Sequence, residues 1–420
     1  MRLFATLRSS LPQREFALWW AGQSISQFGD GVLNVALPLL VLDITKNATD
    51  MGLVVAARLV PTVLFLLLGG LVSDRVSRRL AALTSDAVRA VASAVMGVLA
   101  VAGHLNLPEL LVGSFVFGLF DALFYPASTA LLPEIIAADD LTAANSLSRL
   151  AGTLLGGLLG PVVGGVIAST IGSPWALVVD AASFVISAAS LAAMRPTPTP
   201  EASPHSMLAD IAAGWSYCRR TPWIIWTIVV AGFANAFVFT PSAILLPLFL
   251  RRVLHSPNWM VGVAFAALGV GGLAGSLLMM GAHPRRRVRV MWLVWTVATL
   301  LAIPYAVLRA AWIAVVLSVV AGALLMLGNI LWQSLMQAEV PSEILGRVSS
   351  VDWAVSLGLS PVGVALAGAA ADHFGVRTTI VVPGLVVGVV GLALLFAMPS
   401  ITAIDRRESD AGESGAVETA

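Results

Sequence analysis

Charged residues are scarce in this chain of 420 residues, where Asp, Glu, Lys and Arg together make up 11% of the sequence. Water-soluble domains carry about 25% of such residues, so the composition excludes an ordinary soluble fold. The net charge of +1 and the lack of a dense basic face argue against nucleic-acid binding. The single cysteine, Cys218, excludes an intrachain disulfide and a thiolate metal site. No His/Cys cluster, nucleophile–base pair or phosphate-binding loop is evident, so we expect no enzyme, metal or cofactor.

Long apolar runs take the place of these features, and 58% of the residues are hydrophobic. A helix needs about 20 apolar residues to cross the hydrocarbon core of a bilayer. The runs predict an all-α integral membrane protein with twelve transmembrane helices. The predicted spans are 16–41, 51–73, 80–103, 109–132, 146–170, 174–194, 223–249, 258–281, 288–308, 311–337, 350–371 and 378–399.

Similar features recur 200–210 residues apart and predict two six-helix bundles related by pseudo-twofold symmetry. Pro161 has a counterpart in Pro361, and the basic residues of 75–79 have counterparts in 285–289. Parallel repeats of this kind place a substrate site at their interface. The predicted domains are an N-terminal six-helix bundle (1–194), a cytoplasmic linker with an amphipathic helix (195–222), a C-terminal six-helix bundle (223–403) and a disordered acidic tail (404–420).

The loops differ in their content of Arg and Lys, and this difference predicts the orientation of the chain. If the N-terminus is cytoplasmic, the inner segments hold 17 Arg residues, whereas the outer segments hold four Arg residues and Lys46. Loops rich in Arg and Lys stay on the cytoplasmic side. We therefore expect a multi-pass protein of the cell (inner or plasma) membrane with both termini in the cytoplasm.

Two motifs stand out between and within the predicted spans. The first is a charged loop at residues 69–79, which marks a membrane–water boundary because Asp and Arg side chains are costly in hydrocarbon. The second is a glycine-rich pattern in the span 146–170. The loop motif consists of Gly70, Asp74, Arg75, Ser77, Arg78 and Arg79, and the glycine-rich motif of Gly156, Gly160, Pro161, Gly164 and Gly165.

Both motifs resemble those of the major facilitator superfamily. The loop is similar to its gating motif Gly-x-x-x-Asp-Arg-x-Gly-Arg-Arg, with Ser77 in place of a glycine, and the second to the helix 5 motif of antiporters. Segments 16–30, 124–127 and 180–184 resemble the macrolide- and enterobactin-exporter-like drug:proton antiporter subgroup. The resemblance implies a transporter that uses alternating access and functions as a monomer.

The resemblance also implies roles for the motif residues. Asp74 would act in gating, and Arg75, Arg78 and Arg79 would pair with acids near the fourth span, Glu134 first. The arginines alternatively serve only as topology determinants. The glycines and Pro161 of the fifth span would couple conformational change to transport, or would serve only close packing.

Ionisable residues within spans are candidates for proton coupling. By the helical rise, Asp30 and Arg58 lie at nearly the same depth, which predicts an ion pair that is either a permanent bridge or one that loosens when Asp30 takes up a proton. Asp121 lies near the midplane with no evident basic partner, so it is either a proton carrier or a hydrogen-bonded structural residue. Asp86 and Arg89 form an i, i+3 pair that we expect to be structural.

The second half is expected to have no acid deep in a span and to hold a bulky, largely apolar compound by aromatic faces and polar anchors. The candidate cavity residues are Phe233, Asn235, Phe237, Asn329, Trp332 and Gln333.

The sequence thus predicts proton-coupled efflux of a small hydrophobic or amphiphilic compound, drug-, macrolide- or siderophore-like. The alternatives are a siderophore- or metabolite-specific permease or facilitator without proton coupling, and, less favoured, a non-transporting membrane receptor. The expected partners are this small molecule, protons and the lipid bilayer.

Overall fold

The computed structural model describes residues 14–68, 77–137, 140–196, 207–280, 282, 284 and 286–397. Within these residues the structure consists of helices and their connections, with no strand. Eleven helices are long and apolar enough to cross a membrane. Each predicted span corresponds to a helical segment, and the one outside these eleven is α3, which ends beside the undescribed residues 69–76.

We name residues 14–196 the N-half and residues 222–397 the C-half. The N-half contains α2 (Arg14–Thr45), α3 (Ala48–Leu68), α4 (Arg78–Val101), α5 (Leu107–Ile135), α6 (Leu141–Ala151), η3 (Gly152–Leu159), α7 (Gly160–Thr170) and α8 (Pro174–Ala193). The C-half contains α10 (Pro222–Ala234), η4 (Asn235–Phe239), α11 (Ser242–Leu248), η5 (Phe249–Val253), α12 (Asn258–Met279), α13 (Arg287–Leu300), η6 (Ile303–Ala306), α14 (Ala311–Glu339), α15 (Ser342–Gly358), α16 (Ser360–Phe374) and α17 (Val376–Ala397).

Local sequence signals account for several helix ends. Asn106 and Glu109 form a capping box at the start of α5, and the Ser77 hydroxyl accepts a hydrogen bond from the Leu80 backbone N–H at the start of α4. Gly375 separates α16 from α17 with φ of +82°, a conformation that side chains other than glycine rarely adopt. The fifth span is π-helical over η3, directly before Pro161, which lacks a backbone N–H.

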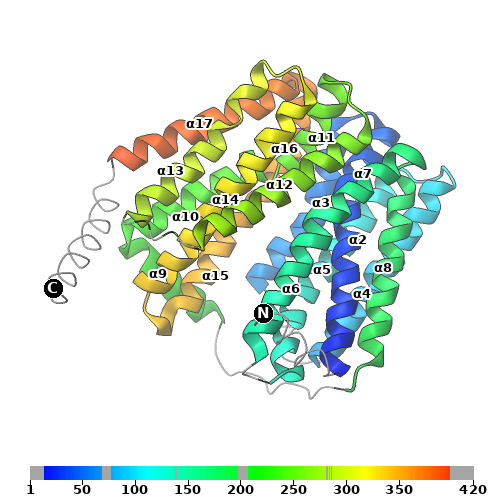
Figure 1. Cartoon of the computed structure of the whole chain (residues 1–420), viewed down its shortest axis with the longest axis horizontal. Helices are drawn as coiled ribbons and strands as arrows, with labels where there is room; N and C mark the ends of the chain where they lie inside the picture. Colours follow the sequence, from blue (N-terminus) through cyan, green and yellow to red (C-terminus); the bar gives the residue numbers. More distant parts are fainter. Residues whose placement is uncertain are drawn as a thin grey trace.

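The two halves meet at one end of the molecule and diverge toward the other (Figure 1). At the top of the figure, α7 of the N-half lies beside α12 and α3 beside α16. We call this end the contact end. At the bottom, α9 (Met207–Arg220) and α15 lie on one side and α6 on the other. We call this second end the α9 end.

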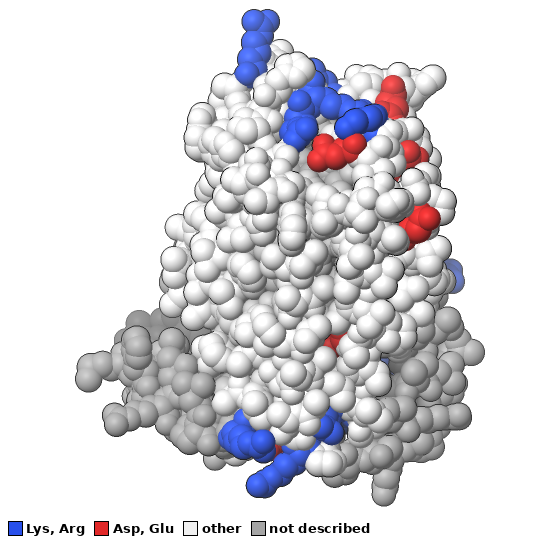
Figure 2. Space-filling model, turned by 90° about the vertical axis from the view of Figure 1, so that its right-hand side faces the viewer, with Lys and Arg blue, Asp and Glu red and all other residues white. Residues whose placement is uncertain are grey.

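Charged side chains on the face shown in Figure 2 lie mostly at the two ends of the molecule. A broad belt between them is almost entirely uncharged. Large apolar side chains such as Val98, Leu277 and Phe396 are more than 60% exposed. Because soluble monomers rarely expose large apolar patches, this belt is the surface expected to face lipid.

The segment between the two halves contains the helix α9, Met207–Arg220. It docks on the C-half, since Gly214 lies directly against the carbonyl group of Arg347 in α15. Trp215 is exposed and Cys218 is buried. Burial raises the pKa of the Cys218 thiol to about 11, so hardly any reactive thiolate is present at neutral pH.

Candidate functional site

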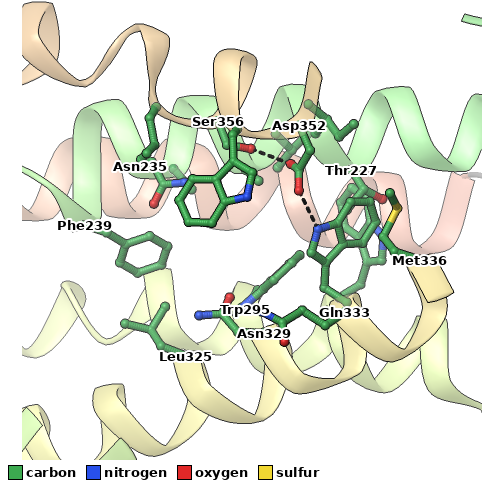
Figure 3. Close-up of a pocket in the computed structure, with 18 of the residues that line it drawn as sticks. Thr227, Asn235, Phe239, Trp295, Leu325, Asn329, Gln333, Met336, Asp352 and Ser356 are labelled. Atoms are coloured by element: carbon green, nitrogen blue, oxygen red, sulfur yellow. Dashed lines mark hydrogen bonds between the residues drawn. The ribbon is translucent and has the colours of Figure 1, made fainter. Parts of the chain in front are cut away.

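A cavity of about 530 Å³ lies inside the C-half and is the candidate ligand pocket. It is lined by residues of α10, η4, α13, α14, α15 and α17. A volume of this size lies within the range of small-molecule sites. Figure 3 shows Asp352 and Ser356 on one side of the pocket, facing Trp295, Asn329 and Gln333 on the other.

Asp352 is the one ionisable side chain among the described residues that line the pocket. Its carboxylate accepts a hydrogen bond of 2.8 Å from the Trp332 indole N–H and another of 2.8 Å from the Ser356 hydroxyl (Figure 3). Both donors are uncharged, so they orient the carboxylate without neutralising it.

The structure corrects the expectation that no acid lies deep in a C-half span. α15 begins at Ser342 rather than near residue 350, and Asp352 therefore lies ten residues, or about 15 Å, along the helix. Trp295 and Trp353, which the sequence reasoning did not select, also line the pocket. The sequence signal that could have identified these pocket residues is the Asp-Trp pair at 352–353, followed by Ser356 one helical turn later.

Four of the six predicted cavity residues line this pocket: Asn235, Asn329, Trp332 and Gln333. Phe233 and Phe237 do not. These two rings stack on each other with centroids 6.0 Å apart, and Phe233 is exposed. The i, i+4 spacing of the phenylalanines thus produces a pair outside the cavity.

The predicted ion pair between Asp30 and Arg58 is present in the N-half. The Arg58 Nη2 atom lies 3.3 Å from Asp30 Oδ1, and the guanidinium group also lies 4.2 Å from the centre of the Phe117 ring. Both charged side chains are only partly exposed. The pair is therefore held between helices α2, α3 and α5.

The expectation that Asp121 lacks a basic partner is wrong. Arg89 Nη1 lies 2.9 Å from Asp121 Oδ1, while Arg89 Nη2 binds Asp86 Oδ1. The guanidinium group carries five N–H donors in a planar fork, so it serves a carboxylate on its own helix α4 and a second one on α5. Arg89 is 1% exposed, and the rings of Phe124 and Phe184 lie 4.3 and 4.4 Å from its guanidinium carbon.

Asp180 of α8 is fully buried beside this network. Its Oδ2 atom accepts a 2.6 Å hydrogen bond from the Ser93 hydroxyl, and its Oδ1 atom has no hydrogen-bond partner among the described residues. Asp180 Oδ1 lies against Gly29, the residue before Asp30. Within the described N-half spans, three carboxylates thus pair with two guanidinium groups, and Asp180 lies beside them without an ion pair.

The loop motif is described only in part. Gly70, Asp74 and Arg75 lie outside the described residues. Arg78 lies 2.9 Å from Glu134 and donates to the Ala130 carbonyl, so the predicted pair with Glu134 is present. Arg79 donates instead to the carbonyl oxygens of Leu191 and Ala192 at the end of α8. Both arginines thus tie the start of α4 to neighbouring helices at the α9 end.

The glycine-rich motif of the fifth span contacts both halves. A Cβ atom added at Gly160 would lie 2.8 Å from Gly31 Cα, one added at Gly156 3.0 Å from the Gln27 carbonyl oxygen, and one added at Gly164 3.0 Å from Val32 Cα. These three residues therefore pack against α2.

The opposite face of the motif contacts the C-half. A Cβ atom at Gly165 would lie 3.0 Å from Gly262 Cα, and one at Gly262 would overlap the Pro161 carbonyl oxygen. The two halves thus meet backbone to backbone between α7 and α12. No side chain larger than hydrogen fits at this crossing without a shift of one helix.

Polar contacts reinforce the junction at the contact end. Asp372 of the C-half accepts hydrogen bonds of 2.9 Å from Arg252, 2.8 Å from the Thr49 backbone N–H and 3.0 Å from the Thr49 hydroxyl. Arg252 also donates to the Lys46 carbonyl, and Arg251 lies 3.6 Å from Asp43. We call Asp43, Thr49, Arg251, Arg252 and Asp372 the contact-end cluster.

Comparison with known proteins agrees with these features. A family described as transmembrane secretion effector matches residues 5–419. The multidrug efflux pump Tap of Mycolicibacterium fortuitum is 26% identical over 383 residues, which cover 87% of this chain and 92% of that protein. Enterobactin exporter EntS of Salmonella typhimurium is 25% identical over 382 residues, which cover 88% of each chain.

Solved structures resemble this fold at low sequence identity. The nucleoside transporter NupG matches with a TM-score of 0.70 at 13% identity, over 92% of this chain and 99% of that chain. A bacterial homologue of the iron transporter ferroportin, in an inward-facing state, matches with a TM-score of 0.71 at 15% identity, over 91% and 98%. At such identities the likeness shows the fold alone.

Proposed function

The chain belongs to the transmembrane secretion effector family of the major facilitator superfamily, and from this premise we propose that it exports small hydrophobic or amphiphilic compounds in exchange for protons. It is a membrane transporter rather than an enzyme. In the proposal, α3 supplies the twelfth crossing and the halves form two six-helix bundles related by pseudo-twofold symmetry. One chain works alone and alternates the access of its pocket between the two sides.

In the proposal the α9 end is cytoplasmic, both termini are inside, and the structure is inward-facing. The excess of Arg in the segments at this end supports the orientation. The contacts between α7 and α12 and the contact-end cluster support a closed outer side.

The observation that carries proton coupling is the surplus of carboxylates in the N-half network. Asp30 pairs with Arg58, and Asp86 and Asp121 share Arg89, whereas Asp180 has no ion pair among the described residues. An unbalanced negative charge is costly inside a membrane, and uptake of a proton removes this cost. Asp30 and Asp121, which are partly exposed, are the proposed exchange sites, since a proton can reach them from water.

The proposal predicts that Asp30→Asn and Asp121→Asn lose transport driven by a pH gradient but keep passive exchange of cargo across the membrane. Everted vesicles, supplied from the medium with a cationic, a neutral or an anionic fluorescent probe in parallel, measure both activities. We expect a loss of about tenfold or more in gradient-driven flux, which corresponds to about 1.4 kcal/mol. Asp50→Asn, at the start of α3 and outside the network, is the control.

The same assay decides between export and the facilitator alternative. A facilitator equilibrates its cargo without responding to an imposed pH gradient. Gradient-driven flux that survives unchanged in both Asp30→Asn and Asp121→Asn would show that these residues do not carry the proton. A wild-type chain that ignores the gradient for every transported probe would refute proton coupling itself.

A further prediction concerns the contact-end cluster. Asp372→Ala removes the acceptor of three hydrogen bonds, two of them from the other half, and is expected to favour opening of this end. A partly exposed charged contact contributes up to about 1 kcal/mol, or a roughly fivefold change in the population of the open state. The alkylation rate of a cysteine introduced at Ala168, which is buried at this junction, reports the change.

Two features make this measurement clean. Cys218, the native cysteine, is buried and its raised pKa keeps it unreactive, so the introduced cysteine dominates the signal. Asp50→Ala removes a carboxylate from the same end, next to Thr49, but the Asp50 side chain has no hydrogen bond or ion pair with the contact-end cluster among the described residues. Equal alkylation rates in the Asp372→Ala and Asp50→Ala backgrounds would mean that the cluster does not hold the halves together.

A further inference from the structure

We propose that the C-half pocket binds lipophilic organic cations and that Asp352 is their counter-ion. This inference rests on the proposed function, because it names the class of cargo that such an exporter would take up from the inner side. It goes beyond that function in excluding anions as preferred ligands. The pocket, its charge and its aromatic lining carry the argument.

The charge of the pocket is the first step. Asp352 is ionisable, and the other described residues that line the cavity are apolar, amide, hydroxyl or aromatic side chains. The donors to its carboxylate, the Trp332 indole and the Ser356 hydroxyl, are both neutral. An organic cation would therefore find an oriented carboxylate that no cation among the described pocket residues neutralises, whereas an anion would meet electrostatic repulsion.

The aromatic lining is the second step. Trp292, Trp295, Trp332, Trp353 and Phe239 all face the cavity. The Trp295 and Trp332 rings lie 6.4 Å apart at an angle of 52°, so they form two differently oriented walls. A cation over the face of a tryptophan ring is attracted by the ring quadrupole, and Trp is the best of the aromatic residues in this role.

Polar anchors are the third step. Asn235, Asn329 and Gln333 place amide groups along the pocket (Figure 3). Amide groups both donate and accept hydrogen bonds, so they suit a ligand that carries an acceptor atom. The favoured ligand is thus a hydrophobic cation of several rings that also carries a hydrogen-bond acceptor.

The test compares two probes of the same shape and opposite charge, tetraphenylphosphonium and tetraphenylborate. Their binding to the purified full chain in detergent is measured by equilibrium dialysis, with no proton gradient. Wild type is expected to bind the phosphonium at least about tenfold more tightly than the borate, after correction for partition of each probe into detergent. Asp352→Asn, which keeps the shape of the side chain, is expected to lose this preference, whereas Asp352→Glu is expected to retain it.

The matched control is Glu343→Gln, which removes a carboxylate from the first turn of the same helix, outside the pocket. It is expected to bind both probes like wild type. The proposal is overturned if wild type shows no preference for the phosphonium, or if Asp352→Asn keeps the preference. It is also overturned if Glu343→Gln loses the preference to the same extent, since the effect is then one of overall charge.

This experiment separates the inference from the proposed function. Binding at equilibrium needs no proton coupling, so a chain that prefers the phosphonium through Asp352 but shows no gradient-driven flux would support the inference and refute the proposed exchange. A chain that exports a neutral or anionic probe against a gradient, with no preference for the phosphonium, would support the proposed export and refute this inference.

Discussion

Gly262→Ala is expected to abolish most transport while leaving both halves folded. A Cβ atom added at Gly262 of α12 would overlap the Pro161 carbonyl oxygen and would lie 3.1 Å from Gly165 Cα. The neighbouring atoms belong to backbone, which cannot move aside as a flexible side chain can. One added methyl group must therefore separate α12 from α7, and with them the two halves at the contact end.

This separation destabilises the conformation described here, in which α7 and α12 are in contact. Overpacking a close contact costs about 1–3 kcal/mol, which lowers the population of this state by about fivefold to more than a hundredfold. Alternating access needs both states, so flux falls when one of them is lost. We expect a loss of gradient-driven flux of at least about tenfold and faster alkylation of a cysteine placed at Ala168.

Gly272→Ala is the matched control for Gly262→Ala. Gly272 lies on the same helix, and the nearest atom to an added Cβ is the flexible end of Met326 at 3.6 Å. Both substitutions raise helix propensity by about 1 kcal/mol, so a difference between them isolates the contact with α7. Normal flux in Gly262→Ala would mean that the close approach of α7 and α12 is dispensable.

The structure also shows which features a sequence of this kind reveals. The hydrophobic lengths predicted the eleven long apolar helices of the described residues, because bilayer thickness sets how many apolar residues a span needs. Depth along a helix follows from the rise per residue, and this predicted the Asp30–Arg58 pair. The Arg78–Glu134 pair was expected from family resemblance together with charge.

What the sequence did not reveal depends on rotation about helix axes and on exact helix starts. Arg89 was assigned to Asp86 by spacing, but its helix also turns it toward Asp121 on α5, which no one-dimensional pattern reports. Asp352 was not selected, because the predicted span begins at residue 350 and so puts it near the end of the span rather than deep within it. Phe233 and Phe237 share the segment of Asn235 but point elsewhere, since neighbouring positions on a helix lie on different faces.

Replacement of Arg89 is expected to cause the largest loss of stability of any single change in the N-half network. Arg89 is almost fully buried and is the shared cation of Asp86 and Asp121. Arg89→Met keeps much of the length and apolar contact of the side chain but leaves two carboxylates without a cation. Removal of one partner from a buried ion pair costs about 3–5 kcal/mol, because the remaining charge is uncompensated.

Two further substitutions, Arg89→Lys and Arg58→Met, are expected to lower stability less than Arg89→Met does. Arg89→Lys keeps the charge but replaces a planar fork by a single ammonium group, which cannot hold both carboxylates in the same geometry, so we expect an intermediate loss. Arg58→Met is expected to be milder, since Arg58 and Asp30 are 17% and 27% exposed and water can solvate the remaining carboxylate. Thermal unfolding of the purified variants in detergent measures this order.

Replacing Asp86 and Asp121 by Asn tests whether uncompensated charge causes the loss of stability in Arg89→Met. If uncompensated charge is responsible, Arg89→Met combined with Asp86→Asn and Asp121→Asn should regain much of the lost stability, because the two carboxylates that Arg89 had paired with are then neutral amides. The triple variant should nevertheless fail to couple flux to a pH gradient, since Asp121 is a proposed exchange site. Stability that stays low in the triple variant would show instead that Arg89 acts mainly by packing between Phe124 and Phe184, where its guanidinium group lies.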